Sequence, residues 1–208
     1  MFPTRALVAA LATTAAALPA SAQTATFNFD ADAAGTATSF TDTNNGIAAT
    51  FDSTAGQGAF MVQDSFFQNQ SGNDLGAVVG ANSVPLDVAF SKSLTSLSLN
   101  FGLNGPTNST FTVTAFSGGL SGTQVGSATA GGAIPGGIYL FPEGSVSLAT
   151  TSPFDTVELT STAVNIFVDN IAVSAPVPEA STTVSLGLLL ALGAGGVALT
   201  ARKRRALS

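Results

Sequence analysis

Apolar residues recur at every second position in several short stretches of this chain, and this period of two is the feature that most restricts its fold. A strand points successive side chains to opposite faces of a sheet, so such stretches bury one face. Turn clusters rich in Gly and Asn separate them, such as Asn44-Asn45-Gly46. We therefore predict an all-β fold, a single antiparallel β-sandwich of the jelly-roll kind. The alternating sets are Phe27 and Phe29; Leu86, Val88 and Phe90; Leu97, Leu99, Phe101 and Leu103; Phe111 and Val113; Val146 and Leu148; and Val157 and Leu159.

The first 22 residues have the pattern of a secretory signal peptide. Arg5 precedes an apolar stretch from Ala6 to Leu18, and the segment ends in Ala20-Ser21-Ala22. Small residues in this A-x-A arrangement are typical of a signal-peptidase site. We predict cleavage between Ala22 and Gln23, after export through the Sec translocon.

The C-terminal thirty residues have the pattern of a membrane anchor. The run from Val184 to Ala201 carries no charge, and at about 1.5 Å per residue its helix spans roughly 27 Å, close to the thickness of a bilayer core. A basic cluster follows, which fixes the tail on the cytoplasmic side. Its residues are Arg202, Lys203, Arg204 and Arg205.

These patterns divide the chain into five parts. We predict a signal peptide (1–22), an ectodomain (23–175), a motif and linker (176–183), a transmembrane helix (184–201) and a basic cytoplasmic tail (202–208). The ectodomain has a length that suits one domain.

A short motif precedes the apolar run: Val177, Pro178, Glu179, Ala180 and Ser181, followed by Thr182. With the run and the basic end, it resembles the PEP-CTERM sorting signal of bacterial exported proteins. In that family a Pro-Glu-Pro-type motif, one transmembrane stretch and a basic terminus are recognised by a membrane-embedded exosortase. The resemblance implies an inner-membrane-anchored precursor that is cut near the motif and passed to the cell surface or extracellular matrix, often beside exopolysaccharide. Ala180 stands where the family usually has its second proline. A plain membrane anchor is the alternative interpretation.

The composition of the ectodomain excludes several functions. It carries eleven acidic residues and one basic residue, Lys92, for a formal charge of −10, which rules out binding to the phosphates of a nucleic acid. The whole chain lacks Cys and His, which excludes disulfides and His-dependent triads and removes the usual ligands of zinc, copper and haem. Lys92 lies in a predicted Ser91–Ser93 turn between two strands, where a solvated role is expected. Neither glutamate, Glu143 or Glu158, marks a glycosidase pair, so we predict no enzyme activity.

The closing strand contains a carboxylate that strict alternation places on an apolar face. In the segment from Phe167 to Val173, Asp169 would share a face with Phe167, Ile171 and Val173. A buried carboxylate needs a partner, and Ca²⁺ accepts carboxylate and amide oxygens. One hypothesis is therefore a structural calcium. In the other, Asp169-Asn170 forms a bulge whose carboxylate accepts from backbone N–H groups. The candidate ligands are Asp30, Asp32, Asp169 and Asn170.

The ectodomain also resembles the jelly-roll domains that often precede this tail. The resemblance rests on the opening segment Phe27–Asp30 and on the closing segment Phe167–Val173. In carbohydrate-binding-module-like sandwiches, similar strands lie near each other and a structural calcium can be bound.

Two functions remain from the sequence. The first is an exported structural or adhesive protein of the envelope or matrix. The second is a surface carbohydrate-binding or carbohydrate-processing module delivered by the same tail. The chain has no Trp and a single Tyr, Tyr139, which counts against aromatic sugar platforms.

Overall fold

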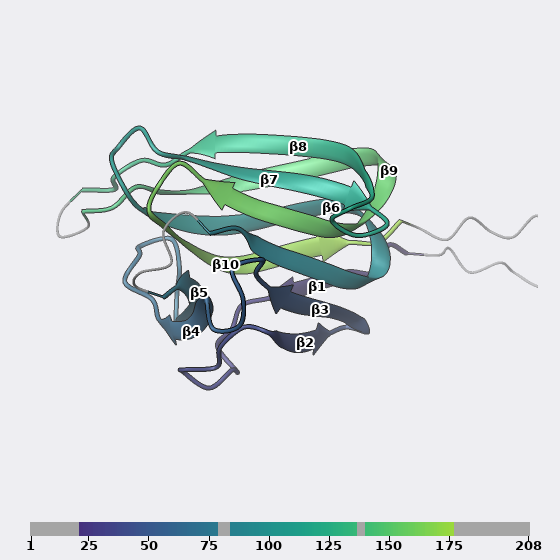
Figure 1. Cartoon of the computed structure of the whole chain (residues 1–208), viewed down its shortest axis with the longest axis horizontal. Coiled ribbons are helices and arrows are strands. Elements are labelled where there is room, and N and C mark those ends of the chain that lie inside the picture. The colour runs from purple at the N-terminus through teal and green to yellow at the C-terminus, as the bar shows by residue number, and fades with distance from the viewer. Residues whose placement is uncertain (1–20, 79–83, 137–139, 177–208) are drawn as a thin grey trace, which may run out of the picture. The chain divides into compact units, whose positions relative to one another are not determined.

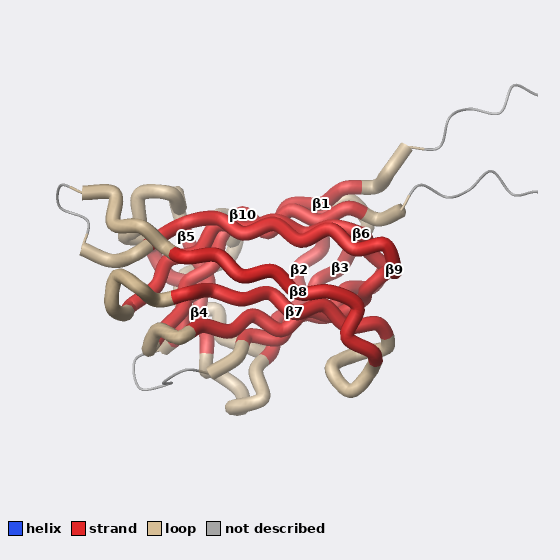
Figure 2. Tube along the Cα trace, turned by 90° about the horizontal axis from the view of Figure 1, so that it is seen from above, coloured by secondary structure: helices blue, strands red, loops and turns tan. Residues whose placement is uncertain are grey.

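The computed structural model describes residues 21–78, 84–136 and 140–176, and they contain ten strands and no helix. Figure 2 shows strands throughout, joined by loops at both ends of the domain. The expected all-β, antiparallel fold is confirmed. The strands are β1 (Thr24–Phe27), β2 (Phe40–Asn44), β3 (Ile47–Asp52), β4 (Phe60–Asp64), β5 (Asn73–Ala77), β6 (Leu86–Asn104), β7 (Thr110–Ser117), β8 (Thr123–Gly131), β9 (Glu143–Ser161) and β10 (Asn165–Ser174).

Within residues 21–78, 84–136 and 140–176 no helix is long and apolar enough to cross a bilayer. The predicted transmembrane helix, sorting motif and basic cluster, together with Ala20, lie outside the described residues. Residues Ala22–Val177 form one compact unit.

Hydrogen-bonded strands follow the order β4-β5-β10-β6-β9-β7-β8, with β1 beside β10 and β3 between β2 and β6. Figure 1 shows β7 and β8 along one side of the domain and β2 to β5 on the opposite side. The first and last strands are neighbours, because Thr24 to Phe27 pair with Ile171 to Ser174. The two ends of the domain therefore meet.

Two long strands, β6 and β9, connect the layers of the sandwich. The first part of β6 pairs with β3, and its second part pairs with β10. Between these parts the pairing of β6 with β9 shifts register, at residues 89 to 96. The predicted turn at Ser91–Ser93 is therefore wrong: polar side chains mark an irregularity inside one strand, and the chain does not reverse.

Most alternating sets form the core, as the period of two predicts. Leu97, Leu99, Phe101 and Leu103 of β6 are all buried. Phe101 stacks on Phe111 of β7 with ring centroids 4.8 Å apart, although β6 and β7 are not paired. This contact joins the two layers across the core.

The predicted turn at Asn44-Asn45-Gly46 closes the hairpin of β2 and β3. Asn45 has φ 45° and Gly46 has φ 70°, both in the left-handed region. Asn and Gly adopt this conformation most readily, which is why the pair favours a tight hairpin. The side chains of Asn44 and Asn45 donate to the carbonyls of Thr26 and Thr24, and so cover the edge of β1.

Candidate functional site

The closing strand β10 contains a bulge at Asp169 and Asn170. Its pairing with β6 shifts register between Asp169 and Ala172, and Asn170 has φ 53°. Oδ1 of Asp169 accepts from the backbone N–H of Asn170 at 2.6 Å, and Oδ2 accepts from the N–H of Ser71 at 3.4 Å. The Asn170 side chain also donates to Oδ2, at 2.7 Å. The bulge hypothesis is confirmed.

This bulge changes the face on which Asp169 lies. Val168 pairs with Phe101 and Val173 pairs with Leu97, and all four side chains are buried in the core. Asp169 pairs with Asn100, on the opposite face of the sheet. The prediction that Asp169 shares a face with Ile171 and Val173 is therefore wrong, because the extra residue inverts the alternation after Asn170.

A second carboxylate that the sequence analysis did not single out lies opposite Asp169. Phe167 pairs with Gly76 and Val168 with Leu75, so the same register brings Asp74 of β5 opposite Asp169. Both side chains are fully buried, and neither oxygen of Asp74 has a hydrogen-bond partner of normal geometry. We call Asp74 and Asp169 the carboxylate pair.

Burial is the main cause of the abnormal acidity of the carboxylate pair. It raises the pKa of Asp74 to about 6, the charge of Asp169 adds to the rise, and the side chains of Ser65 and Gln63 oppose it. Burial likewise raises the pKa of Asp169 to about 6. The backbone N–H groups of Asn170 and Ser71 lower this pKa, and the charge of Asp30 raises it further. Like charges directly opposite each other on neighbouring strands repel, so the ionised carboxylate pair destabilises the folded domain at neutral pH.

The other two predicted ligands separate in the structure. Asp30 lies near Asp169 and raises its pKa. Its Oδ1 accepts from the N–H of Asn73 at 2.9 Å. Burial raises the pKa of Asp32, and the further contribution comes from Asp42. The structure thus brings Asp30 toward the carboxylate pair and leaves Asp32 beside Asp42.

A loop over residues 65–72, between β4 and β5, covers the carboxylate pair; we call it the covering loop. The carboxylate of Glu143 accepts from the N–H groups of Gln68 and Asn69, at 3.1 and 2.5 Å. The Asn69 side chain donates to the carbonyl of Gly144 at 2.7 Å. The side chain of Gln70 donates to the carbonyl of Phe167 at 3.2 Å. These contacts explain why Asp169 is buried on a face that points away from the core.

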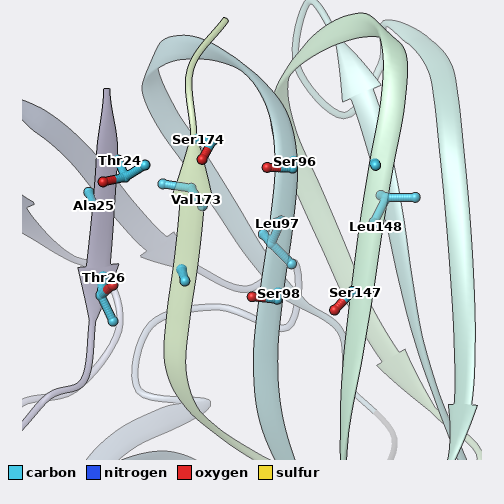
Figure 3. Close-up of a pocket in the computed structure, with 12 residues that line it drawn as sticks. Thr24, Ala25, Thr26, Ser96, Leu97, Ser98, Ser147, Leu148, Val173 and Ser174 are labelled. Carbon is cyan, nitrogen blue, oxygen red and sulfur yellow. The ribbon is translucent and has the colours of Figure 1, made fainter. Parts of the chain in front are cut away.

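Beyond the bulge the same face becomes a shallow groove of small side chains, with a volume of about 410 Å³. Figure 3 shows β1, β10, β6 and β9 side by side, with hydroxyl groups from each strand in the groove. Two rows cross the four strands in register. One row is Thr24, Ser174, Ser96 and Ala149, and the other is Thr26, Ala172, Ser98 and Ser147.

Two residues of the covering loop, Phe66 and Phe67, belong to an aromatic cluster. Phe66 stacks on Phe67 with centroids 4.5 Å apart and meets Phe167 edge-on at 5.1 Å. Phe141 completes the cluster, 5.9 Å from Phe66. Phe66 is 48% exposed, so one ring of the cluster faces solvent. None of the alternating sets in the sequence contains Phe66, because this ring lies in a loop and not in an alternating strand.

Across the described ranges, no three acidic side chains lie together in a way that could hold a metal ion. The calcium hypothesis for Asp30, Asp32, Asp169 and Asn170 stays a prediction. Lys92, the single basic residue of the ectodomain, donates from Nζ to Oε1 of Gln23 at 2.6 Å on the surface.

No protein-family profile and no curated protein matches the chain. Among solved structures, a cleaved adhesin domain of Lys-gingipain from Porphyromonas gingivalis is 14% identical, with a TM-score of 0.45, covering 74% of this chain and 98% of that one. A variant of the family 29 carbohydrate-binding module CBM29-2 is 13% identical, with a TM-score of 0.38, covering 74% and 93%. The catalytic domain of a GH87 α-1,3-glucanase in complex with nigerose is 13% identical, with a TM-score of 0.39; the match covers 77% of this chain and 29% of the glucanase chain. Likeness at this level assigns neither a family nor a function.

Proposed function

We propose that this is an exported bacterial protein of the envelope or extracellular matrix, sorted through its PEP-CTERM-like tail. The observation that carries the proposal is the order of segments: an export signal, one acidic domain, the Val177–Ser181 motif, an uncharged run and a basic end. The Sec translocon exports the chain, the run at 184–201 anchors the precursor in the inner membrane, and an exosortase-like enzyme cuts it near the motif.

The limits of the folded domain support this order. β1 begins at Thr24, just after the predicted cleavage site, and β10 ends at Ser174, just before the linker. Because β1 pairs with β10, the domain closes on itself between the two targeting segments. Such a jelly-roll-like domain can be released from its anchor without losing a strand.

We assign the ectodomain a structural or adhesive role without enzyme activity. Several of its carboxylates accept hydrogen bonds from backbone N–H groups, among them Glu143, Asp155 and Asp169. A formal charge of −10 suits a hydrated matrix and repels nucleic acid.

The test is to express the full chain in an exosortase-producing bacterium and in the same strain without exosortase, and to measure the mature mass. We expect the exosortase strain to yield a chain that starts at Gln23 and lacks the basic end. Glu179→Ala should leave the precursor in the inner membrane, whereas the matched change Thr183→Ala, outside the motif, should not. An uncut chain in both strains would contradict the sorting role.

A second function, carbohydrate binding, is favoured by the hydroxyl-lined groove and the exposed ring of Phe66. Hydroxyl groups can exchange hydrogen bonds with sugar hydroxyls, and an exposed ring can pack against a sugar face. The natural ligand would be an exopolysaccharide. A glycan array on the mature protein tests this, with Ser147→Arg to fill the groove and Thr123→Arg on β8 as the control. Binding that only Ser147→Arg removes would support a carbohydrate module; no binding would leave the structural role.

A further inference from the structure

A second set of carboxylates crosses three adjacent strands, none of which contains a member of the carboxylate pair. Asp52 of β3 pairs with Asp87 of β6, and Asp87 pairs with Glu158 of β9. Residues paired in this way share a face, with Cβ atoms about 5 Å apart. We call these three residues the acidic row. The sequence does not reveal it, because its members lie in three separate segments.

The acidic row lies on the face that points away from the core. Leu86 and Val88, which flank Asp87, are fully buried in the core. Alternation therefore sends Asp87 to the outer face, together with exposed Ala89. Glu158 follows the same rule, because its neighbours Val157 and Leu159 are core residues.

Asp87 is nevertheless buried, with 7% of its surface exposed. Its Oδ1 has no hydrogen-bond partner. Burial raises the pKa of Asp87 to about 6; the charges of Glu158 and Asp52 add to the rise, and the backbone of Thr54 opposes it. A buried oxygen with a free lone pair, between two other carboxylates, lacks a positive partner.

The row borders a hollow of about 450 Å³ that offers further oxygen atoms. Asp52 and Asp87 line it, and so do hydroxyl residues from the segment after β3, from β9 and from the β7–β8 loop. Their names are Ser53, Thr54, Thr156 and Ser121. No protein cation is available to fill the gap, because Lys92 is the only basic residue between 23 and 175 and its Nζ is bonded to Gln23.

We propose that the acidic row is a binding site for one divalent cation, Ca²⁺, held by Asp87 and an adjacent carboxylate. Because no three acidic side chains of the described residues converge as a metal centre, the remaining ligands are hydroxyl and backbone oxygens and water. Ca²⁺ accepts six to eight oxygen ligands in flexible geometry, which suits such a mixed set. This site is separate from the one predicted around Asp169.

The experiment is calcium titration calorimetry on the full chain in detergent, together with thermal melts in EGTA and in CaCl₂. We expect a dissociation constant of about 10⁻⁴–10⁻³ M, the range of extracellular calcium modules. Asp87→Asn should weaken this binding at least about tenfold, because it removes a direct ligand. Asp64→Asn, an exposed carboxylate at the end of β4, and Asp74→Asn, in the carboxylate pair, should leave it unchanged.

The melts give a second signature. In EGTA, Asp87→Asn should melt above the unaltered chain, because it removes a repelled, desolvated charge. In CaCl₂ the unaltered chain should rise and the variant should not. If Asp87→Asn does not fold, Asp52→Asn, at the exposed end of the row and in the lining of the hollow, should show the same loss of binding.

Three results would overturn the proposal. The first is no calcium uptake by the unaltered chain up to about 10 mM, well above the expected range. The second is unchanged binding in both Asp87→Asn and Asp52→Asn. The third is binding that only Asp74→Asn removes, which would assign the ion to the carboxylate pair.

Discussion

Replacing Asp74 by Asn should stabilise the domain at neutral pH. Asp74 and Asp169 lie opposite each other, fully buried under the covering loop, and the oxygens of Asp74 have no hydrogen-bond partner of normal geometry. Asn keeps the shape of the side chain and removes the charge. Its amide group can donate to Asp169 across the strands, so the substitution replaces a repulsion by an attraction.

The pKa of Asp74 sets the magnitude. It rises from 3.8 to about 6, and one unit corresponds to about 1.4 kcal/mol, which gives roughly 3 kcal/mol. Burial is the largest cause of this rise, and the charge of Asp169 is a smaller one. Because the Asn amide must also find partners in a buried site, we expect a net gain of about 1–3 kcal/mol at pH 7.

The raised pKa values of the buried carboxylates determine whether the stability of the domain rises or falls with pH. Between pH 4 and 6 the folded chain binds more protons than the unfolded chain at Asp74, Asp87 and Asp169, so stability falls as pH rises through this window. The stabilisation is complete below pH 3.8 and is lost above about 6. The unaltered chain should therefore be more stable at pH 4.5 than at pH 7.

Urea unfolding followed by circular dichroism, from pH 4.5 to 7.5 in EGTA, measures both effects. Asp74→Asn should flatten the slope, whereas the exposed control Asp64→Asn should keep it. The control is needed because residues 23–175, with a formal charge of −10, also repel one another less at low pH. The reasoning would be refuted by an Asp74→Asn variant that is less stable than the unaltered chain at pH 7, or by stability that rises with pH across this range.

Three further changes test the covering loop and the calcium hypothesis. Glu143→Ala should destabilise the domain by about 2–3 kcal/mol in urea, because it leaves two N–H groups of the covering loop without their acceptor; hydrogen exchange at those groups should become faster. Gly102→Ala should lower the free energy of unfolding by about 1–3 kcal/mol, because the new Cβ would lie 2.4 Å from ring atoms of Phe67. A decrease smaller than the error of the urea fit would contradict this packing. If calcium binds at Asp169 as well as at the acidic row, Asp169→Ala should remove part of the calcium-dependent rise in melting temperature, and an unchanged rise would remove Asp169 from the ligands.

The sequence predicted which segments form strands better than it predicted where one strand ends and the next begins. The period of two located the buried faces of β6 and β7, and Asn45-Gly46 located a hairpin, because both signals are local. The Ser91–Ser93 turn was wrong because polar residues mark turns and strand irregularities alike. Nothing local distinguishes them; the pairing of β6 with its neighbours does.

The sites were harder to predict because sheet register decides them. Asp74 follows Gly72 and Asn73 in what looks like a turn, yet it is the second residue of β5. The bulge at Asn170 reverses the alternation of side chains along β10. Asp169 therefore lies on the outer face, although strict alternation would place it on the same face as the core residues Ile171 and Val173. A period of two carries no information about an inserted residue, so the partner of Asp169 becomes visible only once β5 and β10 are paired.

The shortage of positive side chains explains why carboxylates dominate the candidate sites. With Lys92 alone between residues 23 and 175, buried acids must rely on backbone N–H groups. Where enough N–H groups are present, they stabilise the ionised carboxylate. Partial burial alone would raise the pKa of Asp155, but the N–H groups of Gly119 and Gly118 bring it below its ordinary value. Asp74 and Asp87 have no such pair of donors, and burial raises the pKa of both. A domain built this way gains stability either from protons or from divalent cations, and outside the cell at neutral pH only the cations are abundant. The difference in melting temperature between CaCl₂ and EGTA therefore tests whether the buried carboxylates of this fold are suited to the proposed extracellular destination.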